Sequence, residues 1–448
     1  MNFDQALAYL LSLGHETLTI KLGLKNTEIL LDSLGNPHQQ FPAVQIAGTN
    51  GKGSVAVMLD SICQRAGIRT GCFTSPHLVS ITERMSINGE RISEDDFARL
   101  TERVRRTAAE LVEQERLATL PTFFEHTTAI ALLAFWEAKV ELAILETGLG
   151  GRLDSTTAAR ADIVAITPIA MDHEEYLGHT LAEIASEKAA TIHPGVTAVI
   201  APQEKEALRV ILGRCHAVGV EPRLVDLSER FQRVTETSAD GQFVVTFAND
   251  GSEYENVRLG LRGHHQIANA ATAIALAEAL RERGFPINHG AIAEGIEQAR
   301  HPGRLEIREG SPRILFDGAH NPAAARMLRD YLEEFVRGPI TMIFGAMRDK
   351  ALDEMAGVLF PKADELILAS LDNPRAASME MLIAVVPASF EKTRTHKTAS
   401  VSEALQLARA ITRDDGLICV TGSLHLVGAI QEIISGESRS VAHQRVAH

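Results

Sequence analysis

The sequence predicts an α/β protein whose larger domain is a mostly parallel sheet with helices on both faces. Short apolar runs alternate with helical patterns between residues 43 and 200, which is typical of a parallel sheet. A glycine-rich loop follows the first run, and the alternation restarts after residue 300. We therefore expect a P-loop domain with a small antiparallel element over 1–299, a smaller Rossmann-like C-terminal α/β domain over 300–435 and a flexible polar tail over 436–448.

Composition excludes several classes of protein. The chain has 448 residues, 45% of them hydrophobic, and a net charge of −14. An acidic balance argues against nucleic acid as a partner, because nucleic-acid-binding proteins present a basic face. No apolar run is long enough for a membrane span. No signal peptide is recognised at the start, so we expect a reduced, cytoplasmic protein. The cysteines lack metal-type spacing and are Cys63, Cys72, Cys215 and Cys419.

The sequence of the first half of the chain predicts alternating strands and helices. The first forty residues are largely helical in pattern, and an apolar strand then runs into the glycine loop at residue 48. Gly67 is the expected stop of the helix after that loop. Further helices are expected over 94–115 and 125–139. Further strands are expected within 70–77, 140–148, 161–169 and 197–202.

The alternation of strands and helices is interrupted after residue 223. The stretch 243–261 predicts an antiparallel hairpin around Asn249-Asp250-Gly251, and a helix is expected from Gln266 to Arg283. A strand then ends in a polar loop in which Asn321 precedes Pro322. This pair is typical of a helix N-cap and a first helical residue. Further buried strands are expected within 340–347, 365–371 and 417–423.

The loop GTNGKGS at residues 48–54 differs from the usual phosphate-loop spelling, G-x-x-x-x-G-K-[ST]. Gly53 follows Lys52 where a hydroxyl residue is usual, and Ser54 comes next. A strand before the loop and a helix after it supply backbone N–H groups that bind an anion, and Lys52 adds a charge. Ser54 could reach a bound Mg²⁺. A plain glycine turn is the alternative, but the combination favours a phosphate site.

Polar residues follow the next strands at the same edge of the sheet. Ser75 lies in a loop after the second strand, and Glu146 ends the strand that begins at residue 142. A carboxylate beside a phosphate loop is suited to Mg²⁺, although a salt-bridged strand end is also compatible. Asp172 and His173 follow another strand. Lys188 lies on a helix among small residues, which favours an inward-facing side chain over a solvated one.

Eight motifs follow one another along the chain: GTNGKGS, TSPHL, LETGLGGRLDST, MDHEEYLG, GHHQIANAATA, HPGRLE, FDGAHNP and VTGSLHLVG. Together they resemble the folylpolyglutamate synthase/dihydrofolate synthase family, the folate branch of the Mur-type ligases. The resemblance covers about residues 45 to 430, in family order. It implies that ATP phosphorylates a carboxylate and that the amine of L-glutamate attacks the acyl phosphate.

The resemblance also implies roles for individual residues. Ser75 and Glu146 would be ligands of one Mg²⁺ ion, and His173 a ligand of a second. Lys188 would carry a carbamate, which offers a cation an anionic oxygen where an ammonium would repel it. A monovalent cation such as K⁺ is compatible with this site. The ATP phosphates would be cradled by Gly48, Thr49, Asn50, Gly51, Lys52, Gly53 and Ser54.

The second domain is expected to complete the site. Arg304 would reach the ATP phosphates, although an interdomain salt bridge is the alternative. Asp317 and His320 would lie at the nucleotide and the glutamate chemistry, although 317–321 could also be a plain helix cap. Asn269, from the first domain, would lie near the adenine. Domain closure would exclude water from the acyl phosphate.

The acceptor is expected to bind in an apolar slot formed by a helix from Leu22 to Leu34 and by the loops after Ser75 and Gly150. GLGGRLD is similar to members that extend both dihydropteroate and reduced folates, so we expect a bifunctional, monomeric enzyme. Acceptor contacts are expected from Pro76, His77, Arg84, Gly151, Arg152 and Asp154.

Four positions depart from the usual family pattern. Ala170 and Met171 replace Ser and Leu before Asp172-His173, Thr157 stands near a usual asparagine, and Tyr176 replaces a usual tryptophan. None of these changes removes an expected catalytic residue.

Three alternatives remain. The first is an enzyme that only extends folates. The second is another Mur-type amide ligase, but a cell-wall Mur ligase would carry a nucleotide-sugar domain before the loop at Gly48. The third is a P-loop ATPase or nucleotide-sensing module without ligase chemistry, which would have no use for HPGRLE or DGAHNP.

Overall fold

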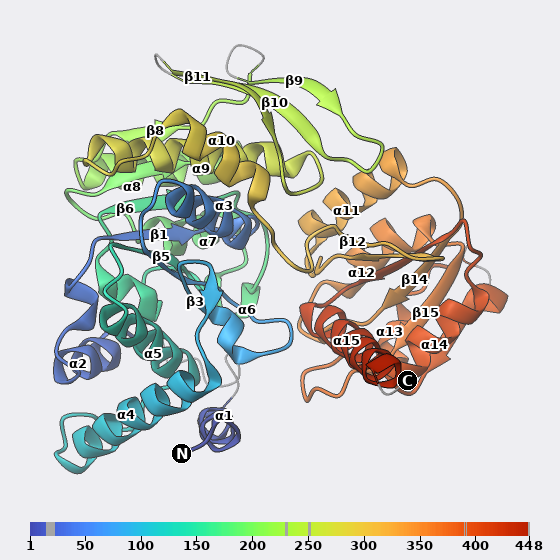
Figure 1. Ribbon diagram of the computed structural model, residues 1–448, viewed down its shortest axis with the longest axis horizontal. Coiled ribbons are helices and arrows are strands. Elements are labelled where there is room, and N and C mark those ends of the chain that lie inside the picture. Colours follow the sequence, from blue (N-terminus) through green and yellow to red (C-terminus); the bar gives the residue numbers. More distant parts are fainter. Residues whose placement is uncertain (15–22, 229–231, 250–251, 389, 391, 447–448) are drawn as a thin grey trace.

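Three sheets form the frame of the protein (Figure 1). In the described part of the chain they have eight, three and six strands. The first two are built before residue 259 and the third after residue 305. The computed structural model describes residues 1–14, 23–228, 232–249, 252–388, 390 and 392–446.

The eight-stranded sheet has the order β4-β3-β2-β5-β1-β6-β7-β8 and is parallel from β2 to β8. Its central strands are buried along their whole length, because helices cover both faces. The predicted fold class is confirmed. The parallel strands are β1 (Ala43–Ala47), β2 (Thr70–Phe73), β5 (Leu142–Glu146), β6 (Ile163–Ile166), β7 (Thr197–Ile200) and β8 (Pro222–Leu224).

The antiparallel edge of this sheet was not predicted. Strands β3 (Met85–Ile87) and β4 (Glu90–Arg91) form a short hairpin through Asn88 and Gly89, both with positive φ. Asn-Gly is a strong hairpin signal, but strands of three and two residues carry too little alternation to be recognised.

Alternating side chains of the sheet belong to different cores. Val44 and Ile46 pack with α3, α9 and α10, whereas Ala43 packs on the opposite face with the N-terminal helices. The first group is α3 (Lys52–Arg65), α9 (His265–Glu282) and α10 (His289–Gln298). The opposite face carries α1 (Phe3–Ser12), α2 (Lys25–Ser33), α4 (Glu94–Glu113), α5 (Phe123–Glu137), α6 (Glu174–Leu177), α7 (Leu181–Ala189) and α8 (Lys205–Ala217).

The predicted hairpin supplies two strands of the three-stranded sheet, although residues 250 and 251 of its turn lie outside the described part. Strands β10 (Phe243–Asn249) and β11 (Ser252–Arg258) pair antiparallel, and β9 (Gln232–Thr237) joins β10 on its other side. The β9 strand was missed because five of its six residues are exposed, so no apolar alternation marks it. This sheet packs on α9 and α10.

The C-terminal sheet has the order β12-β13-β17-β14-β15-β16, with only β12 antiparallel among the described strands. Asn321 caps α11 and Pro322 begins it, as predicted. The strands are β12 (Glu306–Arg308), β13 (Arg313–Phe316), β14 (Ile340–Phe344), β15 (Glu365–Ala369), β16 (Thr395–Thr398) and β17 (Leu417–Thr421). The helices are α11 (Pro322–Phe335), α12 (Leu352–Leu359), α13 (Met379–Ala384), α14 (Val401–Ile411) and α15 (Leu424–Val446).

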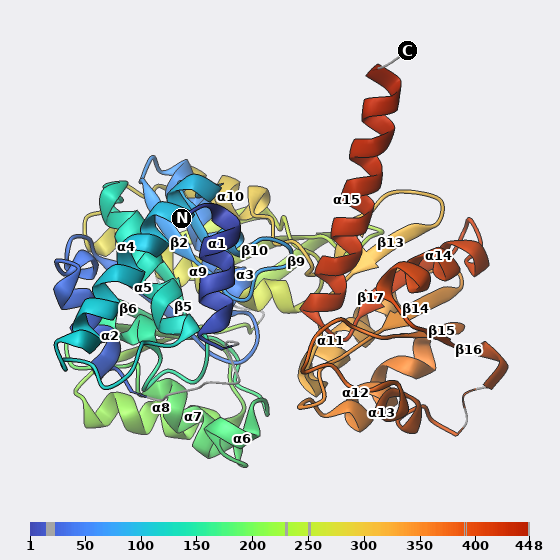
Figure 2. The same ribbon diagram turned by 90° about the horizontal axis from the view of Figure 1, so that it is seen from below.

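A flexible tail was expected over 436–448. In the structure α15 continues to Val446 and projects away from the C-terminal sheet (Figure 2), and residues 447 and 448 lie outside the described part. The residues after Gly436 include Glu, Ala, Gln and Arg, which favour helix, and a preceding helical turn lets the helix extend through them. Among the described residues no helix has both the length and the apolar character of a membrane span.

Gly71 in β2 provides a test of the packing. A Cβ at this position would lie 2.5 Å from Cγ of Phe135, a fully buried ring of α5. We expect Gly71→Ala to destabilise the protein by about 1–3 kcal/mol through overpacking. Gly213→Ala is the matched control, because a Cβ there meets nothing within 4 Å on the exposed side of α8. Urea unfolding should show no loss for the control; equal losses for both variants would contradict the packing account.

Candidate functional site

A cavity of about 560 Å³ lies between the two domains. The loops at the carboxyl ends of β1, β2, β5 and β6 line it from one side, where ligands of parallel α/β sheets bind. Residues of the C-terminal domain line it from the other side, including 317–320 and 422–425. The predicted site residues can therefore be placed against one continuous space.

The phosphate loop connects β1 to α3. Gly51 is the N-cap of α3 with φ +89°, and a Cβ there would lie 2.4 Å from Oδ1 of the buried Asn269. The first N–H groups of a helix have no partner inside it and suit an anion. Lys52 Nζ donates to Thr49 O over 3.1 Å, so its charge stays beside these groups. All seven predicted loop residues line the cavity.

Ser75 and Glu146 end neighbouring strands and meet at the edge of the cavity. The Ser75 backbone N–H donates to Glu146 Oε2 over 3.0 Å. A hydroxyl and a carboxylate beside a phosphate loop form a donor set that fits Mg²⁺, which keeps several water or phosphate ligands. Within the described part of the chain, no three His, Cys, Asp or Glu side chains gather at one metal site, so the protein alone would leave most coordination positions to other ligands.

Lys188 of α7 points inward, as the sequence predicted. Its side chain is 5% exposed and Nζ donates to Gly48 O over 2.8 Å. Burial, together with a smaller effect of the nearby charge of Lys52, lowers the pKa of Lys188 to about 7. A substantial fraction of the side chain is then a neutral amine near neutral pH. Carbamate formation requires a neutral amine, so this environment fits the expected modification.

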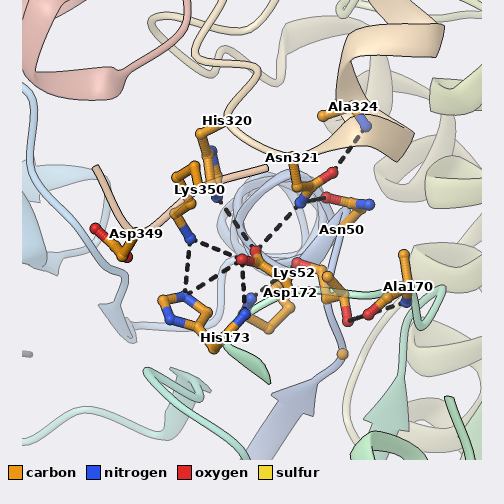
Figure 3. Close-up of polar contacts among 12 residues, drawn as sticks. Asn50, Lys52, Ala170, Asp172, His173, His320, Asn321, Ala324, Asp349 and Lys350 are labelled. Carbon is orange, nitrogen blue, oxygen red and sulfur yellow. Dashed lines mark hydrogen bonds and ion pairs between the residues drawn. The ribbon is translucent and has the colours of Figure 1, made fainter. Parts of the chain in front are cut away.

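A buried ion pair joins the two domains beside the phosphate loop (Figure 3). Lys350, in the loop after β14, lies 2.7 Å from Asp172 Oδ1 and 3.5 Å from His173 Nε2. Burial alone would raise the pKa of Asp172, but His173, Lys350 and His320 together hold it well below its usual range. Burial lowers the pKa of His173 to about 3, so its imidazole is neutral and able to bind a cation.

Asn321 adds a second link between the domains. Its Nδ2 donates to Asn50 Oδ1 over 3.0 Å and to Asp172 Oδ2 over 3.2 Å, while its Oδ1 caps α11 by accepting from Ala324 N. The cap expected from the sequence is thus also part of the site. Lys350 and the second function of Asn321 were missed; the charged residues after the apolar β14 strand were the available signal for Lys350.

The other predicted residues of the second domain also face the cavity. Asp317 accepts from Leu305 N over 3.0 Å and from Ala319 N over 2.9 Å, and burial raises its pKa. Arg304 lies close enough to oppose that rise. Burial lowers the pKa of His320 to about 4, and its Nδ1 lies 2.8 Å from Gly318 O. The contact with Gly318 O orients the ring, so that Nε2 points toward Asp172 Oδ2, which lies 3.7 Å away.

The predicted acceptor residues divide into two groups. Pro76, His77, Arg84 and Asp154 line the cavity, whereas Gly151 and Arg152 do not. Arg152 is 55% exposed and pairs with Glu187 at 2.9 Å. A Cβ on Gly151 would lie 2.9 Å from Glu187 O, so this glycine lets the loop pack against α7.

Two aromatic residues supply an apolar wall that the sequence did not predict. Phe123 and Phe124 line the cavity at the start of α5, and the guanidinium of Arg84 lies 5.4 Å from the Phe123 ring centroid. The capping box of Thr122 and Glu125 fixes this helix start and was the available signal.

The helix expected to form the acceptor slot lies elsewhere. Residue 22 lies outside the described part, and no residue of α2 from Lys25 to Ser33 lines the cavity. Its Leu30 and Leu31 are instead buried in the core with α4 and α5. Among the described residues before Gly48, only Leu11 and Gly23 line the cavity.

Two protein-family models match the chain. Residues 46–277 match the Mur ligase middle domain, and residues 303–424 match the Mur ligase glutamate ligase domain. A Bacillus subtilis protein named dihydrofolate synthase/folylpolyglutamate synthase is 34% identical over 94% of this chain and 96% of its own length. A Halobacterium salinarum protein, named a probable bifunctional folylpolyglutamate synthase/dihydropteroate synthase, is 35% identical over 95% of this chain. The chain spans about half the length of that relative, 51%.

Solved structures show the same architecture over nearly the whole chain. Escherichia coli FolC in complex with DHPP and ADP has a TM-score of 0.85 and 32% identity, covering 98% of this chain and 99% of its own. A bifunctional folylpolyglutamate synthase/dihydrofolate synthase with Mn, AMPPNP and L-glutamate bound has a TM-score of 0.83 and 28% identity, covering 97% and 98%. The chain therefore belongs to the folylpolyglutamate synthase/dihydrofolate synthase family of Mur ligases.

Proposed function

We propose that this protein is an ATP-dependent ligase that adds L-glutamate to dihydropteroate and to reduced folates through an acyl phosphate. One observation carries the proposal. A single cavity has a phosphate loop, an aromatic wall and the polar loops of a second domain around it. The two relatives solved with nucleotide, DHPP or L-glutamate support the same set of ligands. A P-loop ATPase would not need the second domain or the aromatic wall.

In this proposal the first domain binds ATP. The loop from Gly48 to Ser54 holds the phosphates, and the side chain of Asn269 packs against Gly51. Ser75 and Glu146 hold one Mg²⁺ ion, and His173 with the Lys188 carbamate holds a second. Bound Mg²⁺ neutralises the charge of the phosphate oxygens, which is most of what phosphoryl transfer requires. A relative solved with Mn and AMPPNP supports this divalent site; a monovalent site for K⁺ is a further part of the proposal.

The second domain supplies the groups that meet the transferred phosphate and L-glutamate. Arg304 brings a cation to the cavity opposite the phosphate loop. Asp317 and the neutral His320 lie where the amine would attack. Desolvation of this space protects the acyl phosphate from water. A monomer suffices in this proposal, because one chain supplies every wall of the cavity. Four buried free thiols support a reducing, cytoplasmic setting.

The acceptor range is the first measurement. Purified protein with Mg²⁺, ATP and L-glutamate would receive dihydropteroate and tetrahydrofolate separately, with phosphate release and product masses as readouts. Glutamate added to both acceptors supports the bifunctional proposal. Addition to tetrahydrofolate alone would leave an enzyme that only extends folates. Phosphate release that neither acceptor stimulates would favour an ATPase.

Lys188→Ala tests the metal site. Removing the buried amine removes the anion that a carbamate would supply, and we expect ligation to fall by about 100- to 1,000-fold, on the scale of other lost electrostatic groups. Circular dichroism should remain that of the parent. Lys205→Ala is the control, because Lys205 is an exposed lysine at the start of α8. Full activity of Lys188→Ala would remove this residue from the site.

Phe124→Ala tests the acceptor wall. The ring lies against Gly148, where a Cβ would stand 2.4 Å from its Cζ, so it is held in one place. We expect the KM of the folate acceptor to rise about 10-fold, in line with a lost aromatic contact of one to two kcal/mol, while the KM of ATP stays constant. A parallel rise in both KM values would instead indicate a general change in the cavity.

A further inference from the structure

Gly53 occupies the position at which most phosphate loops carry a serine or threonine, directly after the lysine. A Cβ on Gly53 would lie 2.7 Å from Cε1 and 3.1 Å from Nε2 of His301. It would also lie 3.3 Å from Glu146 Oε2. The space that the usual side chain would fill is therefore taken by an imidazole from the segment between the domains, beside the expected Mg²⁺ carboxylate.

His301 is held on the first domain by a hydrogen bond. Its Nδ1 lies 3.2 Å from Ser54 Oγ, and Gln266 Nε2 lies 3.4 Å from the same oxygen. Because the amide of Gln266 donates to Ser54 Oγ, the hydroxyl proton of Ser54 is available to His301 Nδ1. Burial lowers the pKa of His301 to about 3, and the charge of Arg304 acts in the same direction. The ring is neutral, so its Nδ1 accepts this proton.

The residues that follow His301 are held on the second domain. Gly303 O accepts from Gly318 N over 2.8 Å, and Leu305 N donates to Asp317 Oδ2 over 3.0 Å. Arg304 stands between these two contacts, and a Cβ on Gly318 would lie 2.5 Å from its Nη1. The segment 301–305 is thus fixed to the phosphate loop at one end and to the 317–319 loop at the other.

We propose that His301 is a positioning residue that ties the start of α3 to the interdomain segment and thereby sets Arg304 over the transferred phosphate. Glycine at position 53 leaves the space that this ring occupies, because a Cβ there would lie 2.7 Å from His301 Cε1. The proposal rests on the ligase function proposed above and goes beyond it, because it assigns to His301 the coupling of the nucleotide loop to the second domain.

The first test separates positioning from nucleotide binding. In His301→Ala we expect kcat to fall about 10- to 100-fold, the loss typical of a misplaced catalytic group. The affinity for ADP should change by less than about threefold, because ADP lacks the phosphate that Arg304 would meet. His301→Asn should restore most of kcat, since its Oδ1 can accept from Ser54 Oγ. His264→Ala is the matched control: it removes another interdomain imidazole, 2.7 Å from Glu334, and should keep full kcat.

The second test measures whether the His301 ring contacts Gly53. Gly53→Ala should weaken ADP binding about 10-fold or more in the parent but by less than about threefold in the His301→Ala background, because the clash has been removed. Additive losses would overturn the contact, and equal losses of kcat and ADP affinity in His301→Ala would overturn the positioning role. The ADP cycle needs no folate acceptor. Failure of ligation in the parent protein would therefore contradict the proposed function without affecting this result.

Discussion

The site depends on the buried ion pair of Asp172 and Lys350, because the two residues come from different domains and meet within 2.7 Å. Both side chains are less than 9% exposed. A buried charge that loses its partner costs several kcal/mol, so such a pair strongly disfavours arrangements that separate its members. Asn321 reinforces the junction by bonding both Asp172 and the phosphate loop. The second domain is thereby held against the loop that would bind ATP.

Burial around this junction determines the chemistry of the neighbouring groups. Desolvation keeps His173, His301 and His320 neutral, and it lowers the pKa of Lys188 to about 7. Neutral imidazoles can accept protons or bind cations, whereas imidazolium ions would repel Mg²⁺. The cluster therefore combines the ionised Asp172–Lys350 pair with imidazoles that burial keeps neutral. Neutral imidazoles of this kind fit the phosphates and divalent cations of the proposed function.

Much of this arrangement could be predicted from the sequence. The apolar strands and the polar residues at their carboxyl ends identified the sheet and its functional edge, because strand direction alone brings those residues together. Lys350 and Phe124 could not be predicted in the same way, since their roles depend on how the domains and α5 are placed in space. Arg152 shows the opposite error. Its loop is near the cavity, but its side chain turns outward to Glu187.

The three-stranded sheet also reaches the second domain. Tyr331 Oη donates to Asp240 O over 2.8 Å, and Phe335 packs edge-on against Phe243 at 6.0 Å. These contacts join the domains in addition to the Asp172–Lys350 pair and the segment 301–305. Separation of the domains at the phosphate loop would therefore have to break the Asp172–Lys350 pair, whereas the contacts of the three-stranded sheet could stay in place.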